Sequence, residues 1–142
     1  MSLEQATKHI PEKSTYAIRI FNSEIPSHRI PKLRPSEYYR AVREYIFDDA
    51  SPDEIGRKVL DILFDRVIAE QMIRDFAEYG RGCDALLIHC LAGKNRSPSV
   101  GIAFNEIFSL GHDSKNLEEK FPNYRRHIKD TLVEVASTVK IK

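Results

Sequence analysis

The chain has 142 residues, of which 42% are hydrophobic and 30% charged, and 22 basic against 21 acidic residues give a formal net charge of +1. This balance gives no reason to expect nucleic acid or a membrane surface as a partner. No apolar run approaches the ~18–20 residues of a membrane span. The N-terminus lacks the apolar stretch of a signal peptide, so we expect a cytoplasmic protein. The length fits a single domain, 1–142, which we expect to be monomeric.

In the first third of the chain the pattern predicts two strands. Residues 1–13 are polar and indicate a loose lead-in. The segment TYAIRIF (15–21) is rich in β-branched and aromatic residues, which is typical of a strand. The prolines of 22–37 indicate a loop. A second strand is expected at 41–47 (AVREYIF), ending in the acidic turn DDASPDE.

The remainder of the chain alternates helix and strand patterns. Apolar residues recur at helical spacing over 55–79, which predicts one or two amphipathic helices. The continuous apolar run 85–90 predicts a central parallel strand buried on both faces. A helix is expected from about residue 97 to 110, then a turn at GHDSKN, and a final helix that buries Ile128, Leu132, Val135 and Val139. This order predicts an α/β fold, a small three-layer arrangement with a mostly parallel central sheet flanked by helices.

The chain has two cysteines, Cys83 and Cys90, at the two ends of one predicted strand. An extended strand of that length separates them by roughly 20 Å, so we expect no disulfide between them. Cys83 is expected to be an ordinary small residue. The Cys and His residues lack zinc-ligand spacing, so no metal and no cofactor are expected.

The segment HCLAGKNRS (89–97) places a cysteine where a buried strand gives way to a loop and then a helix. Loop amides and the start of a helix bind anions, and the same field lowers the pKa of a thiol. Cys90 is therefore a candidate nucleophile. Arg96 is a candidate phosphate ligand because its planar guanidinium can bind two oxygens. Gly93 permits a backbone conformation that other residues resist, while Ser97 and His89 are candidates to support the sulfur.

These nine residues match H-C-x-x-G-x-x-R-[S/T], so the chain resembles the cysteine-dependent protein tyrosine and dual-specificity phosphatases over roughly 42–132. The resemblance implies two-step hydrolysis through a phosphocysteine on Cys90. It implies that Ser97 helps the sulfur leave. It also implies that the phosphate group of the substrate, or a free phosphate or sulfate anion in its place, is held by Arg96 and by the loop residues Leu91, Ala92, Gly93, Lys94 and Asn95.

The resemblance also implies an Asp general acid on a nearby loop. Asp49 is favoured because related bacterial members end a strand in a similar F-x-D, and Asp48 is the second candidate. The spacing to Cys90 is longer than is usual in the family, which leaves Asp53 and Asp61 open. Asn123, in a Pro-Asn pair before the last helix, either supports the phosphate loop or caps that helix.

The substrate is less constrained than the chemistry. A compact tyrosine or dual-specificity phosphatase acting on a phosphorylated protein or a small phosphorylated molecule is favoured. Lys94 matches the loop of tensin-type phosphoinositide phosphatases, whereas Leu91 departs from it, so a phosphoinositide or inositol phosphate phosphatase is the alternative. Asn95, directly before Arg96, resembles the corresponding position in the loop of RNA 5′-triphosphatases, so that activity is a less favoured alternative. A catalytically inactive phosphate-binding module is a further alternative. The basic residues Arg125, Arg126 and Lys129 either bind an acidic substrate or form a solvated helix face.

Overall fold

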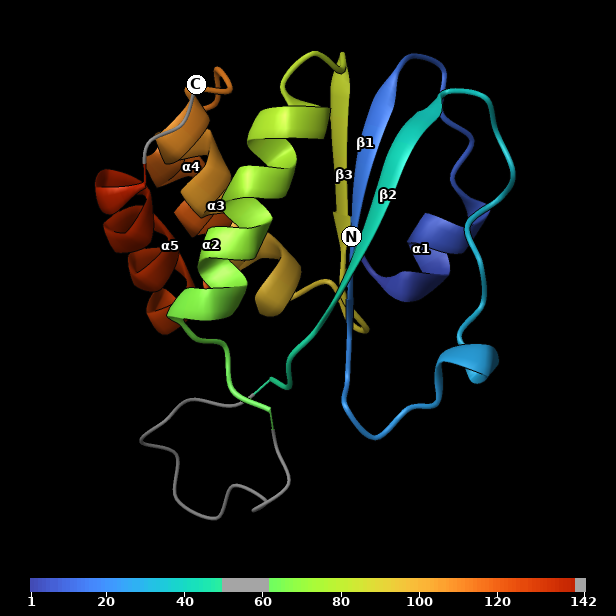
Figure 1. The fold of residues 1–142 in the computed structure, drawn as a ribbon, viewed down its shortest axis with the longest axis horizontal. Helices are drawn as coiled ribbons and strands as arrows, with labels where there is room; N and C mark the ends of the chain where they lie inside the picture. Colours follow the sequence, from blue (N-terminus) through green and yellow to red (C-terminus); the bar gives the residue numbers. More distant parts are fainter. Residues whose placement is uncertain (50–61, 140–142) are drawn as a thin grey trace.

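The computed structural model describes residues 1–49 and 62–139. Three parallel strands form one sheet in the order β2-β1-β3: β1 (Thr15–Phe21), β2 (Tyr39–Ile46) and β3 (Ala85–His89). In Figure 1, α2 (Arg66–Asp75), α3 (Arg96–Phe108), α4 (Ser114–Lys120) and α5 (Arg126–Thr138) cover one face of the sheet. The helix α1 (Leu3–Lys8) lies on the other face, so the predicted three-layer α/β architecture is confirmed. A short 3₁₀ helix (Ser27–Arg29) and a π-helical turn (Phe76–Gly80) complete the elements.

The central strand is β1, which corrects the expectation for 85–90. All seven residues of β1 are buried, whereas β3 pairs only with β1 among the described residues and three of its five residues are half-buried. Alternate β1 side chains face opposite layers, as strand geometry requires. Tyr16, Ile18 and Ile20 join the large core under the helices, and Ala17 packs with Ala6 and Leu87 on the α1 side.

The N-terminal segment contains the helix α1, whereas the expectation for 1–13 is a loose lead-in. Ser2 and Gln5 form a reciprocal capping box at the start of α1, and Ala6 is fully buried. Such a box satisfies two backbone N–H groups that the first helical turn leaves without partners. The backbone of Met1–Leu3 also continues along the end of β3, since Cys90 N–H donates to Met1 O at 3.2 Å and Leu3 N–H donates to Leu91 O at 3.1 Å.

The helices differ from the sequence predictions at the start of α2 and in the presence of α4. In the described part of the predicted helix 55–79, α2 begins at Arg66, with Asp65 accepting from the Ile68 N–H as the N-cap. Ser114 begins α4, where only a turn was expected, because the Asp113 side chain caps Asn116. The final helix buries Ile128, Leu132 and Val135 as predicted. Within residues 1–49 and 62–139, no helix is both long and apolar enough to cross a membrane.

Candidate active site

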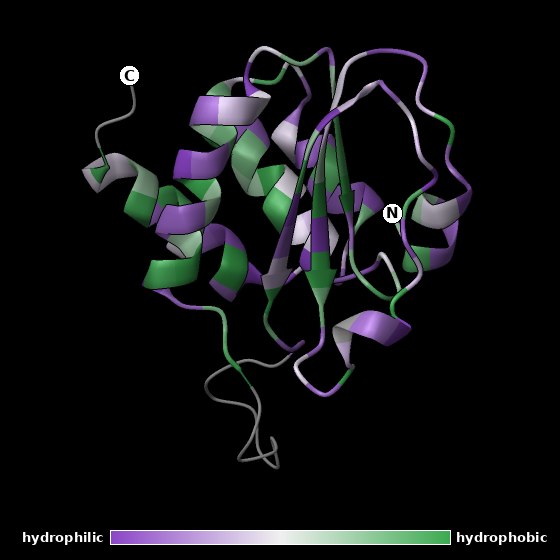
Figure 2. Cartoon of the chain, turned by 45° about the vertical axis from the view of Figure 1, so that its right-hand side comes forward, coloured by the Kyte–Doolittle hydropathy of each residue, from purple (hydrophilic) through white to green (hydrophobic). Residues whose placement is uncertain are grey.

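The site is built where the three parallel strands end. Asn22 follows β1, Phe47 follows β2 and Cys90 follows β3, and the carboxyl ends of parallel strands share one edge of a sheet. In Figure 2 the strand arrows point toward this edge. Ligand sites of open α/β sheets form outside the carboxyl ends of the strands. Helix α3 begins at the same edge, so its positive N-terminal end faces the same place.

Cys90 lies at the bottom of a tight loop that connects β3 to α3. Its side chain is 2% exposed, and its sulfur receives a hydrogen bond from the Gly93 N–H at 3.2 Å. The Ser97 Oγ lies 3.3 Å from the same sulfur. Burial alone would raise the pKa of the Cys90 thiol, but the hydrogen bonds from Ser97 and Gly93 and the positive charge of Arg96 outweigh it. The resulting pKa lies below that of an ordinary thiol, which favours the nucleophilic thiolate.

Gly93 is required at its position for two reasons. Its φ of +73° lies in the left-handed region, which favours glycine over residues with a Cβ. A Cβ there would also lie 2.5 Å from the backbone nitrogen of Ser2. The loop can therefore fold against the N-terminal segment only with glycine at this place, and that fold directs the Gly93 amide to the sulfur.

Arg96 is a buried cation held by the ends of the other two strands. It is 4% exposed, and its Nη1 donates to Phe47 O at 2.9 Å and to Asn22 Oδ1 at 2.6 Å. A guanidinium has five N–H donors in a fixed plane. Two carbonyl-type acceptors on one nitrogen thus fix the plane of Arg96 beside the loop, and its charge lowers the pKa of Cys90.

His89 is neutral and supports the loop from behind. Burial lowers the pKa of His89 to about 4, and the nearby charge of Arg19 acts in the same direction. Its Nε2 accepts from Arg19 Nε at 2.9 Å, so the ring proton is on Nδ1, where it faces Cys90 O at 3.3 Å. Arg19 itself is buried and pairs with Glu44 across the strands at 3.5 Å. The buried Arg19–His89 pair thus fixes the backbone that carries the sulfur. The sequence analysis did not identify Arg19 as a residue of the site, because a charged residue within a strand does not by itself indicate such a contact.

Two neighbouring aspartates at the end of β2 have different environments. Asp48 is buried and accepts hydrogen bonds from the Ser23 N–H, the Ser23 hydroxyl and the Ile62 N–H, at 2.6–3.0 Å. Burial would raise the pKa of Asp48, but these hydrogen bonds and the Arg96 charge hold it below its usual value. Asp48 therefore joins two loops as a carboxylate, and these contacts argue against the acid role that its sequence position left open.

Asp49 instead lies against the cysteine loop. Its Oδ2 accepts from Asn95 Nδ2 at 2.8 Å, and its Oδ1 accepts from Arg125 Nε at 2.9 Å. The carboxyl group is partly exposed, at 32% of its side chain. The structure thus brings Asp49, Asn95 and Arg125 to the loop that carries Cys90. The other two candidates, Asp53 and Asp61, lie outside the described residues.

Asn123 is not the cap of the final helix. Its side chain is exposed in the turn before α5, and the N-cap of α5 is Arg125. The contact to the first turn of α3 comes from the Arg125 backbone, whose N–H donates to Ser99 Oγ at 2.6 Å. The basic cluster also divides: Arg125 contacts Asp49, Lys129 pairs with Glu106 and Glu118, and Arg126 is exposed.

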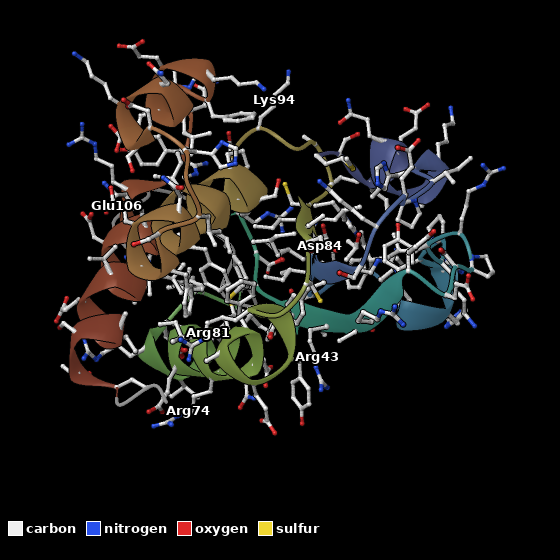
Figure 3. All side chains as sticks on the ribbon, turned by 90° about the horizontal axis from the view of Figure 1, so that it is seen from above. Arg43, Arg74, Arg81, Asp84, Lys94 and Glu106 are labelled. Atoms are coloured by element: carbon white, nitrogen blue, oxygen red, sulfur yellow. The ribbon has the colours of Figure 1, made fainter. Side chains whose placement is uncertain are left out.

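The outer part of the loop is open to solvent. Leu91 is 52% exposed, and Ala92 and Lys94 are exposed as well. Figure 3 shows Lys94 at the outer edge of the loop, with its side chain directed away from the molecule. The described residues contain no group of three or more His, Cys, Asp or Glu side chains that could hold a metal ion. Both cysteines are free thiols.

Comparison with known proteins identifies the fold. Neither the protein-family models nor the curated proteins give a match. Among solved structures the chain is similar to Tk-PTP, a protein tyrosine phosphatase described in its active form, with a TM-score of 0.51 and 17% sequence identity. The match covers 96% of this chain and 85% of that one. The chain therefore has a small α/β fold of the protein tyrosine phosphatase type.

Proposed function

We propose that the protein is a cysteine-dependent phosphatase that hydrolyses phosphate monoesters through a phosphocysteine on Cys90. The observation that carries the proposal is the Cys90 sulfur, buried at the start of α3 with its pKa lowered by Ser97, Gly93 and Arg96. A buried thiol that only filled space would have a raised pKa. The similarity to Tk-PTP supports the proposal at the level of the fold.

In the first step the Cys90 thiolate attacks phosphorus, a sulfur–phosphorus bond forms, and the bond from phosphorus to the leaving oxygen breaks. Asp49 supplies the proton that the leaving oxygen takes up. The loop amides of Leu91–Arg96 and the Arg96 guanidinium stabilise the charge on the three remaining phosphate oxygens. The N-terminal end of α3 adds to the same field.

In the second step water attacks the phosphocysteine. Asp49, now a carboxylate, accepts a proton from that water, the sulfur–phosphorus bond breaks, and inorganic phosphate leaves. Ser97, 3.3 Å from the sulfur, donates a hydrogen bond to the thiolate as it reforms. Each step leaves protons and charges balanced without a metal ion or cofactor.

The substrate class we favour is a phosphorylated protein, tyrosine or dual-specificity, or a small phosphorylated molecule. The exposed Lys94 favours one second candidate, a phosphoinositide or inositol phosphate, because a flexible ammonium at the mouth of the loop can bind a further phosphate. Rates on phosphotyrosine and phosphothreonine peptides beside a phosphoinositide panel separate the two. We expect the peptides to be the better substrates, and Lys94→Ala to slow the phosphoinositides selectively if the second candidate is correct.

Turnover of p-nitrophenyl phosphate in the presence of a chelator tests the proposal. We expect wild-type turnover at pH 5–7 to persist with EDTA and to be lost in Cys90→Ser. Cys83→Ser is the matched control, since Cys83 is the other free thiol and lies outside the loop. It should retain wild-type turnover. A folded wild-type protein that binds phosphate without turnover would identify a binding module instead.

A further inference from the structure

The contacts of Asp49 belong to a closed ring of hydrogen bonds. Asn95 Nδ2 and Arg125 Nε donate to the two carboxyl oxygens of Asp49. The Arg125 N–H donates to Ser99 Oγ, and the Ser99 hydroxyl donates in turn to Asn95 O. Four residues from three segments are therefore joined: the end of β2, the start of α3 and the start of α5.

The ring is anchored in the rigid part of the molecule. Ser99 is fully buried in the first turn of α3, and Asn95 is the N-cap of that helix. Arg125 is the N-cap of α5, a helix that packs on the core through Ile128 and Leu132. Because these anchors do not depend on a substrate, the acid segment, Phe47–Asp49 at the end of β2, is joined to the cysteine loop before any substrate binds.

The ring uses only part of the hydrogen-bonding capacity of Asp49. Each carboxyl oxygen has two acceptor positions, and the ring uses one on each oxygen. The second position on either oxygen is not used by the donors of the ring. The two donors therefore orient the carboxyl group and leave a position on each oxygen outside the ring.

We propose that Asn95 and Arg125 are positioning residues that hold Asp49 over the Cys90 loop and so preorganise the proton transfer. The proposal rests on the phosphatase function and on Asp49 as its acid. Positioning matters because a shift of ~1 Å in a reacting group can cost about 10²-fold in rate. Asn95 links the cysteine loop directly to the acid, because its side-chain amide donates to the Asp49 carboxyl group.

The test compares a poor leaving group, phenyl phosphate, with a good one, p-nitrophenyl phosphate. The rate with a poor leaving group, which needs a proton, should depend on the position of the acid, whereas the rate with a good leaving group should depend on it much less. We expect Asn95→Ala and Arg125→Met each to lower kcat on phenyl phosphate by about 10–10²-fold more than kcat on p-nitrophenyl phosphate.

Two comparisons separate positioning from a merely structural role. In an Asp49→Ala background, Asn95→Ala and Arg125→Met should cause no further loss on phenyl phosphate, because the group that they position is gone. Arg126→Met is the matched control: it removes one positive charge from the adjacent, exposed residue, and both rates should stay at wild-type values. Equal losses on the two substrates, or a full further loss in Asp49→Ala, would overturn the proposal.

A readout without turnover distinguishes failure of this proposal from failure of the phosphatase function. The melting temperatures of Asp49→Ala, Arg125→Met and the double variant form a thermodynamic cycle. We expect the double variant to lose less than the sum of the single losses. Additive losses would contradict the ring even in an active enzyme, and coupled losses in a protein without turnover would contradict the phosphatase function while leaving the ring in place.

Discussion

The two halves of the proposed site, the cysteine loop and the acid segment, are built in different ways. The loop of Cys90–Ser97 is one continuous stretch, and its sulfur, the Gly93 amide and the Ser97 hydroxyl meet through local geometry, whereas the Arg96 guanidinium is held in addition by Asn22 and Phe47. The acid segment of Phe47–Asp49 is placed by residues far along the chain, Asn95 and Arg125, 46 and 76 positions away. A group of site residues that are neighbours in the chain can be recognised from the sequence. A contact between residues far apart in the chain can be recognised only in the folded structure.

The largest expected effect is in the cysteine loop. Arg96→Lys keeps the charge but loses the planar fork that contacts Phe47 O and Asn22 Oδ1 through one nitrogen. We expect kcat/KM on p-nitrophenyl phosphate to fall by about 10³-fold, since lysine cannot present two donors to a phosphoryl group in the same geometry. Circular dichroism controls for folding, and a loss below tenfold would show that charge alone suffices.

The next effect separates the two aspartates of the acid segment. Asp48→Asn replaces a carboxylate oxygen with an amide that faces the donors of Ser23 and Ile62. We expect a loss of about 1–3 kcal/mol in the free energy of unfolding, measured with urea. The rate on phenyl phosphate relative to p-nitrophenyl phosphate should not change. A changed ratio with unchanged stability would exchange the roles of Asp48 and Asp49.

The same residue predicts a pH dependence. The pKa of Asp48 is lower in the folded protein than its usual value. Its contribution to stability is therefore complete above about pH 4, the ordinary range of an aspartate, and is lost as the pH falls through the lower folded pKa. Acid unfolding of wild type and Asp48→Asn should consequently converge at low pH, and a constant difference down to acid pH would contradict this assignment.

The smallest effect concerns the hydroxyl beside the sulfur. Ser97→Ala removes a hydrogen bond that lowers the pKa of Cys90. With that pKa raised, the thiolate forms at higher pH, so the acid limb of kcat/KM should move to higher pH. The loss of one hydrogen bond to a charged sulfur should also lower kcat by about 10-fold or more. An unmoved acid limb would exclude Ser97 from tuning the thiol.

The contrast between the cysteine loop and the acid segment also explains which features could be predicted from the sequence. The strand, loop and helix around Cys90 follow local rules, and the predicted strands and helices are close to the observed ones. Asp49 was favoured over Asp48 only through a resemblance, because no local pattern shows which of two neighbouring aspartates contacts the cysteine loop and only their partners in the fold distinguish them. Arg125 appeared as one charge of a helix face, since no local pattern reports a contact to Asp49.

Two fold errors have physical causes as well. Strand β1 contains Arg19, which interrupts its apolar run, so the apolar run of β3 appeared to be the more buried strand. The charge of Arg19 is satisfied by Glu44 and His89, which only the folded sheet brings together. The ordered N-terminus, in contrast, had a readable signal: Ser2 and Gln5 have the spacing of a capping box.

The central claim is that Cys90 forms a covalent phosphocysteine, and trapping that intermediate tests it most directly. Acid quenching during turnover of p-nitrophenyl phosphate, followed by peptide mass spectrometry, should find one phosphoryl group on the peptide that contains Cys90. Cys90→Ser should show none, and Asp49→Ala, in which intermediate hydrolysis lacks its base, should accumulate more. Wild-type turnover with no phosphorylated Cys90 under these conditions would contradict the account.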